Sequence, residues 1–222
     1  MFVGHYSASF ALKRLDARVP IFPLLIGVQF MDFLFMVFIL FGVERMEIVP
    51  GFTEVNAFVL SYMPYSHSLV AALFWSVVYG AACALLIRHL GLARGILICG
   101  AAVLSHYVLD VLVHTPDMPL IWDPGTKLGL GIWKSRIATI AVETLFLAAA
   151  WFAYIRMSKP GPGAVGKYGA SVFFGFLVLL TIATPFMPVP KTLIELSSQA
   201  LAGYVIIALL GRWVDSRRIY VD

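Results

Sequence analysis

Long apolar stretches place the strongest constraint on the fold of this chain. About 20 residues of apolar helix are needed to cross roughly 30 Å of hydrocarbon, because each helical residue adds about 1.5 Å. Six such stretches can be read in the sequence, near residues 20–43, 67–88, 93–115, 136–157, 168–189 and 193–212. We therefore predict an all-α fold, a polytopic membrane bundle of about six transmembrane helices.

The composition agrees with a membrane protein of one domain. Of the 222 residues, 61% are hydrophobic and 13% are charged, which lies outside the usual range of soluble domains. The segments between the apolar stretches carry loop signals, among them Pro50-Gly51 and the run Pro160-Gly161-Pro162-Gly163. No repeat of fixed period and no long linker divides the chain. We expect a single integral-membrane domain over residues 1–222.

The distribution of Lys and Arg predicts an orientation. With the N-terminus inside, five of the 16 basic residues fall outside, namely Arg45, Lys127, Lys134, Arg136 and Lys191, and the other eleven are cytoplasmic. The positive-inside rule then places both termini in the cytoplasm, and we expect a bacterial inner (plasma) membrane protein. The net charge of +4 requires no nucleic-acid partner, because no basic recognition module is present.

Three ionisable residues stand at helical spacing inside the third apolar stretch. His106, Asp110 and His114 are each four residues apart, so they share one face of a helix. A charged group in a bilayer core costs several kcal/mol, and such groups usually face the protein interior and serve a function. The alternative interpretation is a set of core polar residues that satisfy one another.

Further polar residues interrupt other apolar segments: His5, Asp32, His67 and Glu143. Counting residues from the outer ends of their spans places Asp32, His106 and Glu143 roughly 12 to 15 Å deep. His67 would lie nearer the outer surface, where the chain enters the second span. His5 can reach this region if residues 1–12 form a short helix that enters the bundle from the inner face, which is permitted for segments buried in protein.

Imidazoles and carboxylates together are the ligands of zinc and similar divalent metals. The predicted metal ligands are His5, Asp32, His67, His106, Asp110 and His114, holding one or two ions. Glu143 is better explained by a structural hydrogen bond, and His89 by a position at the cytoplasmic interface beside Arg88. Cys83 and Cys99 have no metal-binding spacing and are interpreted as packing residues.

The motifs resemble those of a known family. Gly4-His5, an Asp in the first span, Ser66-His67-Ser68, and Ser105-His106 with Asp110 resemble the YdjM-type family of membrane-bound metal-dependent hydrolases. The resemblance runs over roughly residues 1–145, the metal-site part, and residues 146–222 add further helices.

The order of ligands is also similar to that of the zinc-dependent phospholipase C and single-strand nuclease superfamily. That resemblance implies one ion held by Asp32, His67, His106 and Asp110, and a second held by His5 with Asp110. Two departures concern a third ion. The last His of that superfamily's motif comes later than His114, and no His follows position 114.

Three functions fit these observations. The first is a metal-dependent hydrolase acting on a phosphoester or ester of a lipid or amphiphile, with Asp32 or Asp110 as the catalytic proton acceptor. The second is a proton or cation transporter, since intramembrane Asp and His chains also form relays. The third is a non-catalytic subunit whose partner is another membrane protein. The cytoplasmic halves of the last three spans are nearly apolar, which favours a one-sided pocket over a permeation path.

Overall fold

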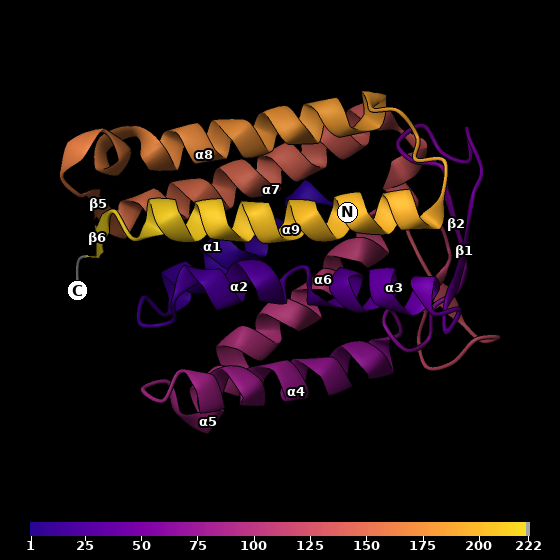
Figure 1. Cartoon of the computed structure of the whole chain (residues 1–222), viewed down its shortest axis with the longest axis horizontal. Coiled ribbons are helices and arrows are strands. Elements are labelled where there is room, and N and C mark those ends of the chain that lie inside the picture. Colours follow the sequence, from indigo (N-terminus) through magenta and orange to yellow (C-terminus); the bar gives the residue numbers. More distant parts are fainter. Residues whose placement is uncertain (221–222) are drawn as a thin grey trace.

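The computed structural model describes residues 1–220 and is a bundle of helices (Figure 1). Five helical segments are long and apolar enough to cross a membrane. They are α4 (Leu69–Leu86), the continuous segment of α5 (Gly91–Arg94), η2 (Gly95–Gly100) and α6 (Ala101–Val113), α7 (Arg136–Arg156), α8 (Gly163–Ala183) extended by η4 (Thr184–Phe186), and α9 (Leu193–Asp215). The predicted all-α bundle is confirmed.

The first predicted span is broken. The apolar stretch at 20–43 forms α2 (Ile21–Gly27) and α3 (Phe30–Leu40), which are bent by 46° relative to each other, so the bundle has six spans if this pair counts as one. At the break, Gln29 Nε2 donates a hydrogen bond to the Phe2 carbonyl, and the Val28 carbonyl accepts one from His106 Nδ1. Tertiary partners thus replace part of the helical hydrogen bonding.

The predicted N-terminal helix is present as η1 (Val3–His5) followed by α1 (Tyr6–Leu15). It packs against α7, α2 and α6, with Tyr6 and Phe10 in the apolar core. Lys13 near its end is buried, and its ammonium donates to the carbonyls of Ala17 and Val19. The segment therefore lies inside the bundle, where every polar group needs an internal partner.

Short antiparallel strand pairs occupy segments that the sequence suggested were loops. They are β1 (Arg45–Ile48) with β2 (Phe58–Tyr62), β3 (Met118–Pro119) with β4 (Lys127–Leu128), and β5 (Ser158–Pro160) with β6 (Arg218–Tyr220). Figure 1 places β1 and β2 at one end of the bundle and β5 and β6 at the other. The remaining short element, η3 (Ile132–Lys134), precedes α7.

The last two helices extend beyond their predicted bounds. The fifth span begins at Gly163 instead of residue 168, directly after the Pro160-Gly161-Pro162 run, and the sixth ends at Asp215 instead of residue 212. Hydropathy marks the apolar part of a helix only, whereas the backbone stays helical through polar residues such as Lys167 and Arg212.

Candidate metal centre

The structure brings all six predicted ligands together from separate elements. His5 ends η1, Asp32 lies in the first turn of α3, His67 precedes α4, and α6 carries the remaining three, with His114 as its C-cap. All are buried except Asp32, whose side chain is 17% exposed. The cluster thus has one member that is partly accessible from outside the protein.

The residues on α6 have the geometry predicted from their spacing. Asp110 Oδ2 lies 3.0 Å from His106 Nε2 and 3.5 Å from His114 Nε2. One carboxylate oxygen is therefore shared between imidazoles one turn before it and one turn after it, as expected for positions i−4 and i+4 of a helix.

Residues from other elements complete the cluster. His67 Nε2 lies 3.3 Å from His106 Nε2 and 3.8 Å from Asp110 Oδ2. Asp32 Oδ1 lies 3.4 Å from His67 Nε2 and 3.6 Å from His106 Nε2. Each of the two carboxylates therefore approaches both imidazoles, between α3, α4 and α6.

His5 lies on the other side of His106. The two rings stack with centroids 3.8 Å apart and an interplanar angle of 8°, and His5 Nε2 lies 3.1 Å from Asp110 Oδ1. The amino group of Met1 contacts the same carboxylate oxygen. Neither ring nitrogen of His5 makes a hydrogen bond of good geometry, so a fully buried imidazole retains unused capacity to bind a ligand.

The outer nitrogens of the other three imidazoles are each held by a neighbouring group. His106 Nδ1 lies 2.7 Å from the Val28 carbonyl, His67 Nδ1 lies 2.7 Å from Ser66 Oγ, and His114 Nδ1 lies 2.9 Å from Asp117 Oδ1. A carbonyl only accepts, so we infer that His106 carries its hydrogen on Nδ1 and presents a lone pair at Nε2. This arrangement is typical of metal-ligating histidines.

The loop before α4 fixes the position of His67. Ser68 is the N-cap of α4, since its hydroxyl accepts a hydrogen bond from Ala71 N and donates one to the Pro64 carbonyl. Of the three serines next to predicted ligands, Ser66 contacts an imidazole, whereas Ser68 caps the helix and Ser105 donates to the Ala102 carbonyl of its own helix.

Glu143 has the structural role that the sequence suggested. Its Oε2 accepts a hydrogen bond of 2.8 Å from Gly4 N, which ties α7 to η1. A Cβ at position 4 would lie 2.9 Å from Glu143 Cγ, so this close approach requires glycine. His89 contacts the Arg18 carbonyl at 3.3 Å in an exposed setting, outside the cluster.

Tyr204 and Glu44 lie next to the cluster and were not predicted from the sequence. The Tyr204 hydroxyl of α9 donates a hydrogen bond to Asp32 Oδ2 at 3.1 Å. This helix lies outside residues 1–145, the part of the chain in which the metal site was predicted. Glu44, after α3, accepts hydrogen bonds from the backbone of Tyr65 and Ser66. Burial raises the pKa of the Glu44 carboxyl, and these hydrogen bonds act in the opposite direction.

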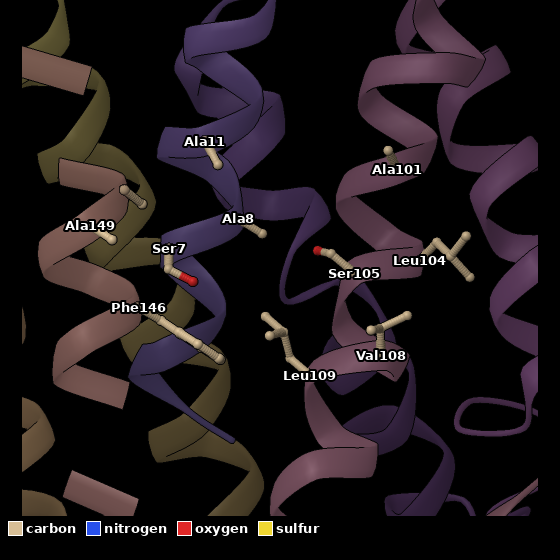
Figure 2. A pocket seen from close by; sticks show the side chains of 11 residues that line it. Ser7, Ala8, Ala11, Ala101, Leu104, Ser105, Val108, Leu109, Phe146 and Ala149 are labelled. Atoms are coloured by element: carbon tan, nitrogen blue, oxygen red, sulfur yellow. The ribbon is translucent and has the colours of Figure 1, made fainter. Parts of the chain in front are cut away.

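An apolar groove of about 650 Å³ lies beside the cluster, between α1, α6 and α7. Figure 2 shows Ser7 of α1 and Ser105 of α6 pointing toward one another across it. None of the six predicted ligands lines the groove. It follows the opposite face of α6 from the one that carries His106 and Asp110.

Two overlapping groups of side chains could hold a metal ion: His5, Asp32 and His106, and His67, His106 and Asp110. The ligand atoms within each group all lie within 4.8 Å of one another. His106 has one nitrogen directed inward, so it serves both groups from the same atom. The arrangement is a buried site for a divalent cation, with imidazole and carboxylate ligands.

Comparison with known proteins assigns no family. The chain matches no protein-family model, no curated protein and no solved structure.

Proposed function

We propose that this protein is a membrane-embedded, metal-dependent hydrolase that acts on a phosphoester or ester of a lipid or amphiphile. The proposed cofactor is a divalent metal, with zinc as the first candidate. From the distribution of Lys and Arg we place it in a bacterial plasma membrane with the C-terminus and the Lys13-Arg14 end of α1 at the cytoplasmic face. The expected cytoplasmic N-terminus is corrected, because Met1 is buried inside the bundle. The observation that carries the proposal is the approach of His67 Nε2 to His106 Nε2 at 3.3 Å, beside two buried carboxylates.

A cation between the rings would account for this approach. Two nitrogen lone pairs that face each other repel, and the neighbouring oxygens of Asp32 and Asp110 are acceptors as well. A proton on one ring would satisfy one contact at a time, whereas a metal ion would satisfy His67, His106 and Asp110 together. A bound cation also offsets the cost of burying two carboxylates in a low dielectric.

The distances around the two imidazole nitrogens fit a small divalent ion. Ligands bound to zinc at about 2.0 to 2.1 Å in a tetrahedron lie about 3.3 to 3.4 Å from one another. The five distances that join the two imidazole nitrogens to each other and to the carboxylate oxygens run from 3.0 to 3.8 Å. The set His67, His106 and Asp110 therefore fits one ion, whereas Asp32 and Asp110 do not share a group of ligand atoms that lie within 4.8 Å of one another. We propose His67, His106 and Asp110 as the primary site, with Asp32 beside it.

When bound, such an ion supplies Lewis-acid activation of an ester oxygen and of a water molecule. The chain's own residues would orient the substrate and accept the proton. Asp110 is enclosed by imidazoles and by the Met1 amino group, with a side chain that is 2% exposed, whereas that of Asp32 is 17% exposed. We therefore assign proton acceptance to Asp32 Oδ2, which Tyr204 holds in position.

The surroundings of Asp32 favour an amphiphilic substrate. The ring of Tyr204 contacts those of Phe2 and Phe33 with centroids 5.7 and 5.2 Å apart. Tyr204 is buried, whereas Phe2 and Phe33 are partly exposed, so a molecule that reached Asp32 past these rings would contact aromatic groups. An alkyl or isoprenoid chain attached to a polar ester suits such groups better than a strongly hydrated solute does.

Metal analysis of the purified protein in detergent tests the proposal. His106→Ala and Asp110→Ala should each lose bound metal, while His89→Ala, which alters an imidazole outside the cluster, should retain it. Hydrolysis of phospholipid and isoprenoid-phosphate substrates should disappear in the first two variants and upon chelation. Metal content that is the same in all three variants would exclude a functional centre at this cluster.

A second candidate function is proton transfer across the membrane. A chain of polar contacts runs from Asp117 through His114, Asp110 and His106 to Asp32 and Tyr204, with steps of 2.9, 3.5, 3.0, 3.6 and 3.1 Å. Reconstituted liposomes with an internal pH dye distinguish the two functions. Proton flux that Asp32→Asn abolishes, without hydrolysis of any ester, would favour transport.

A further inference from the structure

We propose that Glu44 is a positioning residue of the metal centre, which acts through the Ser66 hydroxyl to hold His67 in its metal-binding tautomer. The effect on metal binding rests on the proposed metal-dependent function, whereas the tautomer of His67 can be measured in the metal-free protein. Glu44 is not one of the predicted ligands, and its hydrogen bonds are to Tyr65 and Ser66.

The Glu44 side chain is a buried hydrogen-bond acceptor. Its residue is 1% exposed, its Oε1 accepts from Tyr65 N at 2.8 Å and Ser66 N at 2.9 Å, and its Oε2 accepts from the Ser66 hydroxyl at 2.5 Å. Three donors directed at one carboxylate compensate for its burial. They also tie the end of α3, which carries Asp32, to the loop that delivers His67.

The hydrogen bond from the Ser66 hydroxyl to Glu44 determines which nitrogen of His67 carries the hydrogen. A hydroxyl has one hydrogen, and when it donates that hydrogen to Glu44 it can only accept from His67 Nδ1, which lies 2.7 Å away. His67 then carries its hydrogen on Nδ1 and presents a lone pair at Nε2 toward His106. The opposite direction would place a hydrogen on Nε2 and remove His67 as a ligand.

His67 needs this support more than the other imidazoles do. The outer nitrogen of His106 faces a carbonyl and that of His114 faces a carboxylate, and both partners only accept. A serine hydroxyl can donate or accept, so Ser66 alone leaves the His67 tautomer undecided. Glu44 removes the ambiguity, as second-shell carboxylates do for metal-ligating histidines.

Glu44→Gln is the informative substitution because it keeps the size of the side chain. The glutamine Oε1 can still accept from Tyr65 N and Ser66 N, but its NH₂ group would donate to Ser66 Oγ. The hydroxyl would then be free to donate to His67 Nδ1, which reverses the network. Glu47→Gln, at an exposed position of β1, is the matched control.

The experiment uses the full-length protein in detergent. Metal affinity is measured by chelator competition with Zn²⁺, and the His67 tautomer by NMR of metal-free protein labelled with ¹⁵N-histidine. We expect Glu44→Gln to bind Zn²⁺ about 10- to 100-fold more weakly and to show hydrogen on Nε2 of His67, while the wild type and Glu47→Gln show it on Nδ1. Equal affinities together with the same tautomer in all three proteins would overturn the proposal.

The two proposals can fail separately. If the wild type binds no metal, the hydrolase proposal fails, but a change of tautomer in metal-free Glu44→Gln still supports the network. If Glu44→Gln does not fold, Ser66→Ala provides the second variant, since it leaves the backbone hydrogen bonds to Glu44 in place. Ser66→Ala should weaken Zn²⁺ binding in the same range, and wild-type affinity in this variant would refute the positioning role.

Discussion

Asp110 is the residue at which substitution should have the largest effect on stability. Its two oxygens approach four imidazoles and the Met1 amino group, and its side chain is 2% exposed. Asp110→Asn preserves the shape but removes the negative charge that compensates the buried Met1 ammonium group. Removal of one partner from a buried charge network costs about 3 to 5 kcal/mol. For a domain of this size each kcal/mol lowers Tm by about 2 to 4 °C, so we expect a decrease of roughly 6 to 20 °C.

Thermal unfolding in detergent, followed by tryptophan fluorescence, measures this decrease. Trp133 packs on His114 with ring centroids 4.1 Å apart and reports on the cluster itself. Asp117→Asn is the matched control, because Asp117 contacts His114 and Thr115 at the periphery. The control should lose about 1 kcal/mol, as expected for a single hydrogen bond. Equal losses in the two variants would refute the view that Asp110 is the central charge of the site.

Three further predictions follow from the same contacts. A chelator should lower Tm. Zn²⁺ at 100 times its Kd should restore about 2.7 kcal/mol of unfolding free energy, whereas Mg²⁺ should not. A Tm that neither the chelator nor Zn²⁺ changes would contradict a structural role for bound metal. Gly4→Ala should lower the free energy of unfolding by about 1 to 3 kcal/mol, because the new Cβ would crowd Glu143. Chemical denaturation measures this loss. Gly175→Ala, where nothing lies within 4 Å of the new Cβ, should be neutral or slightly stabilising. Tyr204→Phe should retain metal but reduce ester hydrolysis, because Asp32 loses the hydroxyl that orients it; unchanged kcat would remove Tyr204 from the site.

Features set by local geometry could be predicted from the sequence. The shared face of His106, Asp110 and His114 follows from helical spacing alone, and the spans follow from the lengths of apolar stretches. The meeting of His5, Asp32 and His67 with this face was inferred from the depth at which each was expected to lie, and in the structure their side chains lie close to His106 and Asp110.

Features set by tertiary partners could not be predicted. The bend between α2 and α3 has no Pro or Gly at positions 28 and 29, and its hydrogen bonds come from elements far away in the sequence. Glu44 stands in an ordinary polar loop, and nothing in its neighbours signals a link to Ser66. Ser105 precedes His106 in the sequence but does not support its ring, because adjacent residues of a helix point to different faces.

The break in the first span makes one peptide oxygen unavailable to its helix. In a continuous helix the Val28 carbonyl would accept from the amide of residue 32, whereas here it holds the ring of His106. Any substitution that straightened this segment would set two ligand-bearing residues in competition for a single acceptor. Position 28 is therefore constrained through its main chain, and side-chain chemistry at this position is a poor guide to which replacements the protein tolerates.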